Sequence, residues 1–112
     1  MNIVVLRGVL SSAPVLRDLA SGSRLLSLEV TTRDLEGRAA SVPVAWFDPP
    51  AATSLSEGDE VVVEGAVRRR FFRTGAVTAS RTEVVATAVV PARRRKSVDS
   101  LLERAAQVLA VT

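Results

Sequence analysis

The sequence contains no cysteine and no histidine. The chain therefore has no disulfide, no thiolate or imidazole nucleophile, and none of the usual ligand sets for zinc. Its carboxylates do not form an HExxH motif, and the sequence has neither a P-loop nor a nucleophile elbow. We therefore predict a protein that is not an enzyme, has no catalytic residues, and uses no metal and no cofactor.

Aromatic residues and long apolar runs are also scarce. The 112 residues include one tryptophan, three phenylalanines and no tyrosine. No stretch approaches the ~20 apolar residues that a membrane-spanning helix needs. The N-terminal segment MNIVVLRGVL has no basic lead, and Arg7 interrupts its apolar run, so it is not typical of a signal peptide. We expect a cytoplasmic protein that does not associate with membranes.

Arginine, by contrast, is abundant and unevenly placed. The net charge is +3, but residues 1–60 include five basic and eight acidic residues, whereas residues 61–96 include nine basic and two acidic residues. A basic segment beside a mildly acidic one is typical of a protein with a polyanion-binding face. The alternative is a solvated arginine-rich surface that binds no partner.

Short β-branched runs separated by turn residues dominate most of the chain, and apolar and polar residues alternate within them. A short helix is predicted at residues 51–55. The predicted strands are residues 3–10, 26–31, 42–47, 61–72 and 77–90. Five closely spaced strands, with one short helix between the third and the fourth, indicate an all-β, five-stranded Greek-key barrel.

The end of the chain differs in kind from this barrel, which we assign to residues 1–91. Residues 92–96 read as a basic linker, and residues 97–112 as an amphipathic helix that Ser97 is placed to cap. The apolar residues on one face of this helix are Leu101, Leu102, Ala105, Val108 and Leu109. Because an isolated helix of this length is marginally stable, it should pack on the barrel or on another subunit.

Side chains of the fourth predicted strand alternate between two faces, and Val61 belongs to the face that points inward. Arg68, Arg70 and Phe72 then project together from the outer face, whereas Phe71 has the inner parity and is expected to pack. Guanidinium groups about 6.6 Å apart can follow a phosphate backbone, and a ring beside them offers a base a stacking surface. The alternative is that Phe72 closes the barrel end and the arginines are only solvated.

Phe47, Arg73 and Arg81 extend the predicted surface. Trp46 lies on the same face of its strand as Val44 and is expected in the core, so its neighbour Phe47 points outward. Arg73 and Arg81 flank the hairpin between the fourth and fifth strands and add positive charge to it. Together with the outer face of the fourth strand, these residues form a candidate surface for single-stranded nucleic acid.

The sequence resembles bacterial single-stranded DNA-binding proteins of the OB-fold type over about residues 2–90. The resembling segments are NIVVLRGVL at 2–10, the Pro-x-x-Arg spacing at 14–17, LEVTT at 28–32 and GDEVVVEG at 58–65. The order and spacing of these segments carry the resemblance. It implies that the barrel is an OB-fold.

The resemblance also implies a function and a site. It implies sequence-independent binding of single-stranded DNA in replication, recombination or repair, a homo-oligomer (tetramer or dimer), and a replication or repair protein as a possible partner. It places the family's stacking aromatics on Phe47 and Phe72 and its flanking arginines on Arg68 and Arg70. Stacking and arginine contacts do not read the sugar, so the sequence does not distinguish DNA from RNA.

Three departures from the family pattern modify this expectation. Ser41 stands where the family usually has a tryptophan, and the second hairpin, at residues 35–38, is too short to hold another. The chain ends in a basic linker and a helix instead of an acidic tail. We therefore expect a weaker and more salt-sensitive binder than a typical member. The alternative is a primosome-type OB-fold interaction protein that acts mainly through protein partners.

Overall fold

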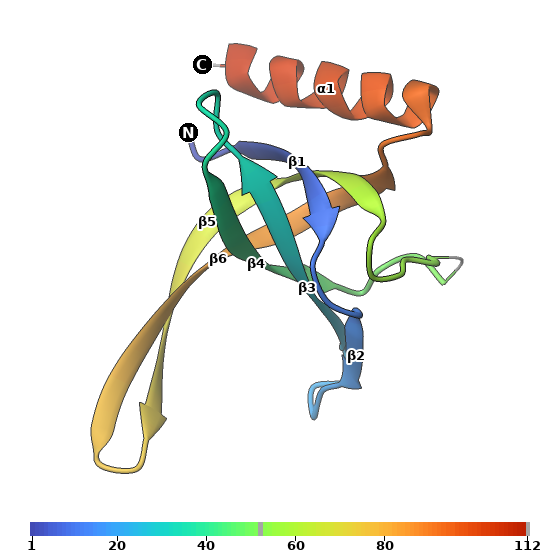
Figure 1. Cartoon of the computed structure of the whole chain (residues 1–112). Coiled ribbons are helices and arrows are strands. Elements are labelled where there is room, and N and C mark those ends of the chain that lie inside the picture. The colour runs from blue at the N-terminus through green and yellow to red at the C-terminus, as the bar shows by residue number, and fades with distance from the viewer. Residues whose placement is uncertain (52, 112) are drawn as a thin grey trace.

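The computed structural model describes residues 1–51 and 53–111. Six strands and one helix follow one another along the chain (Figure 1). They are β1 Val4–Leu10, β2 Val15–Asp18, β3 Arg24–Arg33, β4 Ala39–Phe47, β5 Glu60–Thr74, β6 Val77–Pro91 and α1 Arg95–Ala110. The described chain is therefore mostly sheet, with a single helix at its C-terminal end.

Five of the six strands close into a barrel. The sheet order is β1-β5-β6-β4-β3-β2, and β1 also pairs with β3, so that only β2 lies outside the closed ring. All the pairings are antiparallel except the one between β4 and β6. This is the Greek-key arrangement of an OB-fold, and it confirms the predicted all-β barrel with a C-terminal helix.

One strand of the structure was not predicted, and one predicted helix lies partly outside the described residues. The strand β2 was not predicted, because all four of its residues are exposed and show no alternation of burial. Among the described residues it pairs with β3 alone, as an edge strand. The predicted helix at residues 51–55 includes residue 52, which lies outside the described residues. Ala51 is in a turn, and residues 53–55 belong to neither a helix nor a strand.

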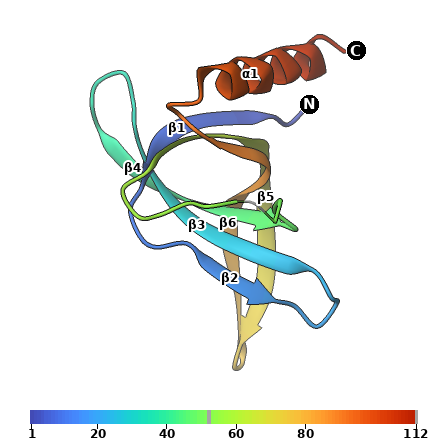
Figure 2. The ribbon, with the colours of Figure 1, turned by 90° about the vertical axis from the view of Figure 1, so that its right-hand side faces the viewer.

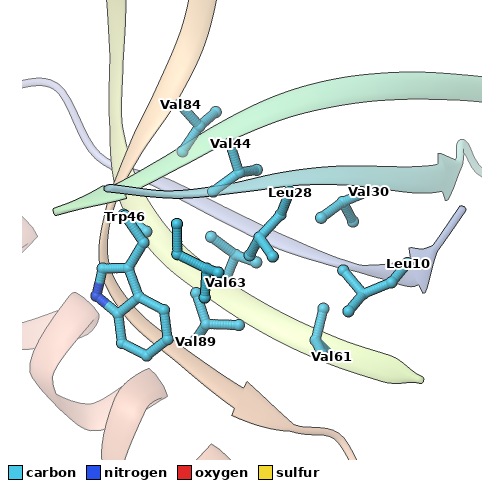
Figure 3. Packing of buried hydrophobic residues seen from close by; sticks show 11 residues of the cluster. Leu10, Leu28, Val30, Val44, Trp46, Val61, Val63, Val84 and Val89 are labelled. Carbon is cyan, nitrogen blue, oxygen red and sulfur yellow. The ribbon is translucent and has the colours of Figure 1, made fainter. Parts of the chain in front are cut away.

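The barrel interior is filled by aliphatic side chains and one indole. Trp46 is buried at one end of the cluster, as predicted from its parity (Figure 3). The other buried members are Leu10, Leu26, Leu28, Val30, Val44, Val61, Val63, Val84, Ala86 and Val89. Because these residues come from all five barrel strands, removing their apolar surface from water favours closure of the ring.

Two glycines allow the barrel backbone to pack closely. A Cβ atom on Gly8 would lie 2.3 Å from the carbonyl oxygen of Thr31, at the point where β1 passes from β5 to β3. A Cβ atom on Gly65 would lie 2.2 Å from the carbonyl oxygen of Val85. The β5–β6 register shifts beside Gly65, and the extra residue, Thr87, forms a bulge that helps β6 to bend around the barrel.

The helix α1 lies across one end of the barrel, where it contacts β5 and β6 (Figure 1). It begins at Arg95 and not at Ser97, so the predicted linker is shorter and Ser97 is not the cap. The N–H of Val98 already donates to the carbonyl of Arg94 (3.0 Å), which starts the helical hydrogen-bond pattern. Within the described residues, no helix has the length and apolar character needed to cross a membrane.

The paired strands β5 and β6 continue beyond the barrel as a two-stranded arm on the side away from α1 (Figure 2). The arm consists of residues 68–83 and turns through Gly75 and Ala76. The prediction that Phe71 packs inward is wrong: its side chain is 67% exposed. Its parity is that of the core residues, but the strand has left the barrel at this point, and no core remains for it to enter.

The packing of α1 on its own barrel can be tested with two adjacent leucines. Leu101 is fully buried, whereas Leu102 is 46% exposed. We predict that Leu101→Ala lowers the free energy of unfolding by about 2–5 kcal/mol, as expected for a buried leucine. The control, Leu102→Ala, should change it by less than about 1 kcal/mol. Urea unfolding followed by circular dichroism measures both, and equal effects would contradict this packing.

Candidate functional site

Side chains from several strands meet on the outer surface where the arm leaves the barrel. There they surround a depression of about 110 Å³. Its charged and aromatic lining residues are Arg17, Phe47, Arg70, Arg81 and Glu83, and the lining is completed by Leu25, Ser27, Pro43, Val44 and Ala45. We call this surface, together with the adjoining Arg68 and Glu29, the groove face. It is formed by β2, β3, β4 and the base of the arm.

The turn of the β5–β6 hairpin determines which arm residues reach the groove face. Thr74 pairs with Val77, so the loop contains only Gly75 and Ala76, and Gly75 has a positive φ of 64°. This short loop sets the register of the whole arm. Arg68 therefore lies opposite Glu83, and Arg70 lies opposite Arg81. All four of these side chains share one face of the arm.

Glu83 is the centre of the charge network on the groove face. Its side chain is only 5% exposed, and its Oε2 accepts a hydrogen bond from Nη2 of Arg68 (2.9 Å). Its Oε1 lies 3.6 Å from Nη2 of Arg70 and 4.0 Å from Nε of Arg81. A buried carboxylate is stable only when it is paired. Glu83 therefore holds three guanidinium groups close together.

Phe47 provides the aromatic surface of the site. It is the last residue of β4, is half-buried, and lies directly opposite Leu25 on β3. The guanidinium carbon of Arg68 lies 5.5 Å from the centre of its ring, within cation–π distance. Arg68 thus contacts Phe47 while it donates to Glu83. A flat ring and a flat cation, both partly exposed, are therefore held beside each other.

A second, more exposed network continues along the same side of the barrel. Nη2 of Arg81 donates to Oε1 of Glu29 (3.3 Å), and the hydroxyl of Ser41 donates to Oε2 of the same carboxylate (3.0 Å). Ser41 is the residue that stands where the resemblance leads us to expect a tryptophan. In this chain it orients Glu29 by a hydrogen bond and offers no stacking surface.

The structure brings four of the six predicted site residues together: Phe47, Arg68, Arg70 and Arg81 lie in or beside the groove face. Phe72 lies on the same face of the arm, closer to its tip, and is 42% exposed. Arg73 is separate from the others. Its parity in β5 places it on the opposite face of the arm.

Sequence reasoning did not identify three charged residues of this surface, namely Arg17, Glu29 and Glu83. Arg17 was noticed only as part of the Pro-x-x-Arg spacing. Glu83 carried a usable signal, because it is the only acidic residue between Glu64 and Asp99. Counting back from a two-residue loop at Gly75 would have placed it opposite an arginine.

The groove face carries four arginines and two glutamates, Glu29 and Glu83, so it retains net positive charge beside an aromatic ring. It can contact an anion and stack on a flat ring. In the part of the chain that the structure describes, acidic residues form no group of three that could hold a metal. Comparison of the sequence with models of known families and with curated proteins gives no match.

The role of Glu83 as the centre of this network can be tested by stability measurements. Arg68→Met with Arg70→Met removes two partners but leaves the buried carboxylate. We predict that this double variant loses about 2–4 kcal/mol of unfolding free energy, because the buried carboxylate then keeps only its 4.0 Å contact with Arg81. Adding Glu83→Gln should restore more than half of the loss. If the triple variant is no more stable than the double, the network does not have this role.

Proposed function

We propose that this protein binds single-stranded DNA without sequence preference, through arginine contacts to phosphates and phenylalanine stacking on bases. The observation that carries the proposal is the position of Arg68 over the ring of Phe47, with Arg70 and Arg81 on the same surface. OB-folds bind oligonucleotides on the face of their second and third barrel strands and on the adjoining loops. Here those strands are β3 and β4, and the groove face lies there.

The arginines supply the affinity for the backbone. Each guanidinium has five N–H donors, and the contacts of Arg70 and Arg81 with carboxylates leave several of these free. The side chains of both residues are about half exposed, at 47% and 48%. Because Glu83 orders them, they lose little freedom when a phosphate arrives. Arg17, on the opposite side of the depression, adds a further donor group.

The aromatic residues supply the preference for unpaired strands. A base can stack on the exposed part of Phe47 or on the plane of Arg68, and a further base on Phe72. Bases of a duplex are already stacked on one another and do not offer their faces to these rings. Every base has such a face, so this contact does not select a sequence. These contacts also do not read the sugar, so RNA is bound by the same chemistry.

The proposal includes a cytoplasmic role in replication, recombination or repair, with a replication or repair protein as a further partner. It also includes assembly into a homo-oligomer, a dimer or a tetramer. Between Val4 and Gly8, β1 pairs with β5, and it reaches β3 only at Val9 and Leu10. One edge of this apolar segment therefore has no paired strand among the described residues. Such edges favour pairing with another copy.

A second candidate function is that of a primosome-type interaction protein, and one observation favours it. Only Leu101 and Ala105 of α1 are buried against the barrel. Leu102, Val108 and Leu109 are 46%, 41% and 59% exposed, so the helix keeps apolar surface for a partner. In this alternative the protein acts mainly through the exposed apolar face of α1, and the groove face contributes little to its function.

The DNA-binding proposal predicts two separable effects in an anisotropy titration of labelled oligo-dT. The fold-preserving variant Arg68→Met/Arg70→Met/Glu83→Gln should reduce affinity about tenfold or more. It should also lower the slope of log K against log salt by about 1.4, for two phosphate contacts at ~0.7 each. Phe47→Leu should weaken binding roughly tenfold at every salt concentration without changing the slope, because it removes only stacking.

Arg104→Gln is the matched control, since it removes one positive charge from the exposed surface of α1. The triple variant also lowers the net charge by one, so a general charge effect would appear equally in both proteins. If Arg104→Gln weakens binding as much as the triple variant does, the groove face is not the binding surface. Unchanged affinity in the triple variant and in Phe47→Leu would have the same meaning.

A further inference from the structure

The arm has a second face, opposite the groove face, that the proposed function does not use. Along β5 it presents Arg69, Phe71 and Arg73, at two-residue intervals of about 6.6 Å. Each of them lies directly opposite a hydroxyl residue of β6. The register pairs are Arg69 with Thr82, Phe71 with Ser80 and Arg73 with Thr78. All six of these residues are exposed. We call this surface the back face.

The back face differs from the groove face in its charge. On the groove face, Glu83 and Glu29 pair with the arginines. None of the six residues of the back face is acidic. Within the described ranges, Arg69 and Arg73 take part in no ion pair. Their positive charge is therefore not offset by a neighbouring carboxylate, so the back face presents two cations that are not engaged in ion pairs.

The back face also carries the most exposed aromatic ring of the described chain. Phe71 is 67% exposed, compared with 42% for Phe72 on the other side of the arm. The closest apolar neighbour along its own face, Val67, is itself 44% exposed. A phenyl ring left in water between two cations gains no burial within the fold. Stacking against a flat ligand would remove that surface from water.

We propose that the back face is a second contact surface for the same nucleic-acid strand; this inference rests on the function proposed above. Arg69 and Arg73 contact phosphates on either side of a base that stacks on Phe71. The hydroxyls of Thr78, Ser80 and Thr82 contact neighbouring phosphate oxygens, as serine and threonine do in protein–DNA complexes. The alternation of cation and ring, with hydroxyls opposite, suits a chain of alternating phosphates and bases.

The two faces are close enough for one strand to reach both. The arm is a hairpin only one sheet thick, and it projects clear of the barrel and of α1 (Figures 1 and 2). Phe71 and Phe72 are consecutive residues on opposite sides of β5. A single strand that leaves the groove face can therefore pass around the arm. A short oligonucleotide occupies the groove face alone, whereas a longer one occupies both faces.

The test compares two lengths of oligo-dT on the full chain. OB-folds cover ~4–16 nucleotides, so we choose about 8 and about 30 nucleotides. We expect Arg69→Gln/Phe71→Ser/Arg73→Gln to weaken binding of the long strand about tenfold or more. The salt slope for the long strand should fall by about 1.4, for two lost phosphate contacts. The affinity for the short strand should change less than about twofold.

Arg93→Gln/Arg94→Gln is the matched control, because it removes two exposed positive charges at the other end of the molecule. An equal loss for both variants would overturn the inference in favour of general charge attraction. The inference would also be overturned if the triple variant bound the long strand as tightly as the wild type does. The same holds if light scattering showed that a change in oligomeric state accounts for the loss. In each of these outcomes the wild-type protein still binds the short strand, so the proposed function itself is not contradicted. If the wild type binds neither strand, the proposed function itself is wrong.

Discussion

The long antiparallel pairing of β5 with β6 organises both the barrel and the arm. Within the barrel this ladder contributes Val61, Val63 and Val89 to the core and supports α1. Beyond the barrel the same ladder becomes the arm. A two-residue loop at one end and the bulge beside Gly65 determine its register and its bend. The fold and the candidate site are therefore set by the same strand pairing.

This pairing also explains the balance of charge on the groove face. It places Glu83 opposite Arg68 and within reach of Arg70 and Arg81. The carboxylate orders the guanidinium groups, but it also cancels part of the charge that a phosphate would meet. Ordering favours binding by lowering its entropic cost, while partial neutralisation weakens it. The expected result is a moderate, salt-sensitive affinity for nucleic acid. Base stacking on phenylalanine adds binding free energy that salt does not screen.

Much of the fold could be predicted from the sequence. Apolar residues alternate with polar ones in each barrel strand, and the apolar spacing becomes helical after residue 97. Parity also placed Trp46 in the core and Arg68 and Arg70 on one outer surface. It misled us at Phe71, since parity states which side a residue faces and not whether a core exists on that side. The partners of the arginines, Glu83 and Glu29, depend on strand register and on tertiary closeness. The periodicity within one β-strand does not contain that information, and for Glu83 only the two-residue loop after Thr74 indicates the register.

If the proposed function is right, the protein distinguishes single-stranded from double-stranded DNA. The most direct measurement is an anisotropy titration of labelled oligo-dT and of the matching duplex, at about 50 and about 200 mM salt. We expect the single strand to bind more tightly at both concentrations, and its advantage to grow with salt as the charge contribution falls. Equal binding of both forms that disappears at the higher salt would contradict the claim. The arginines would then be a general polyanion surface.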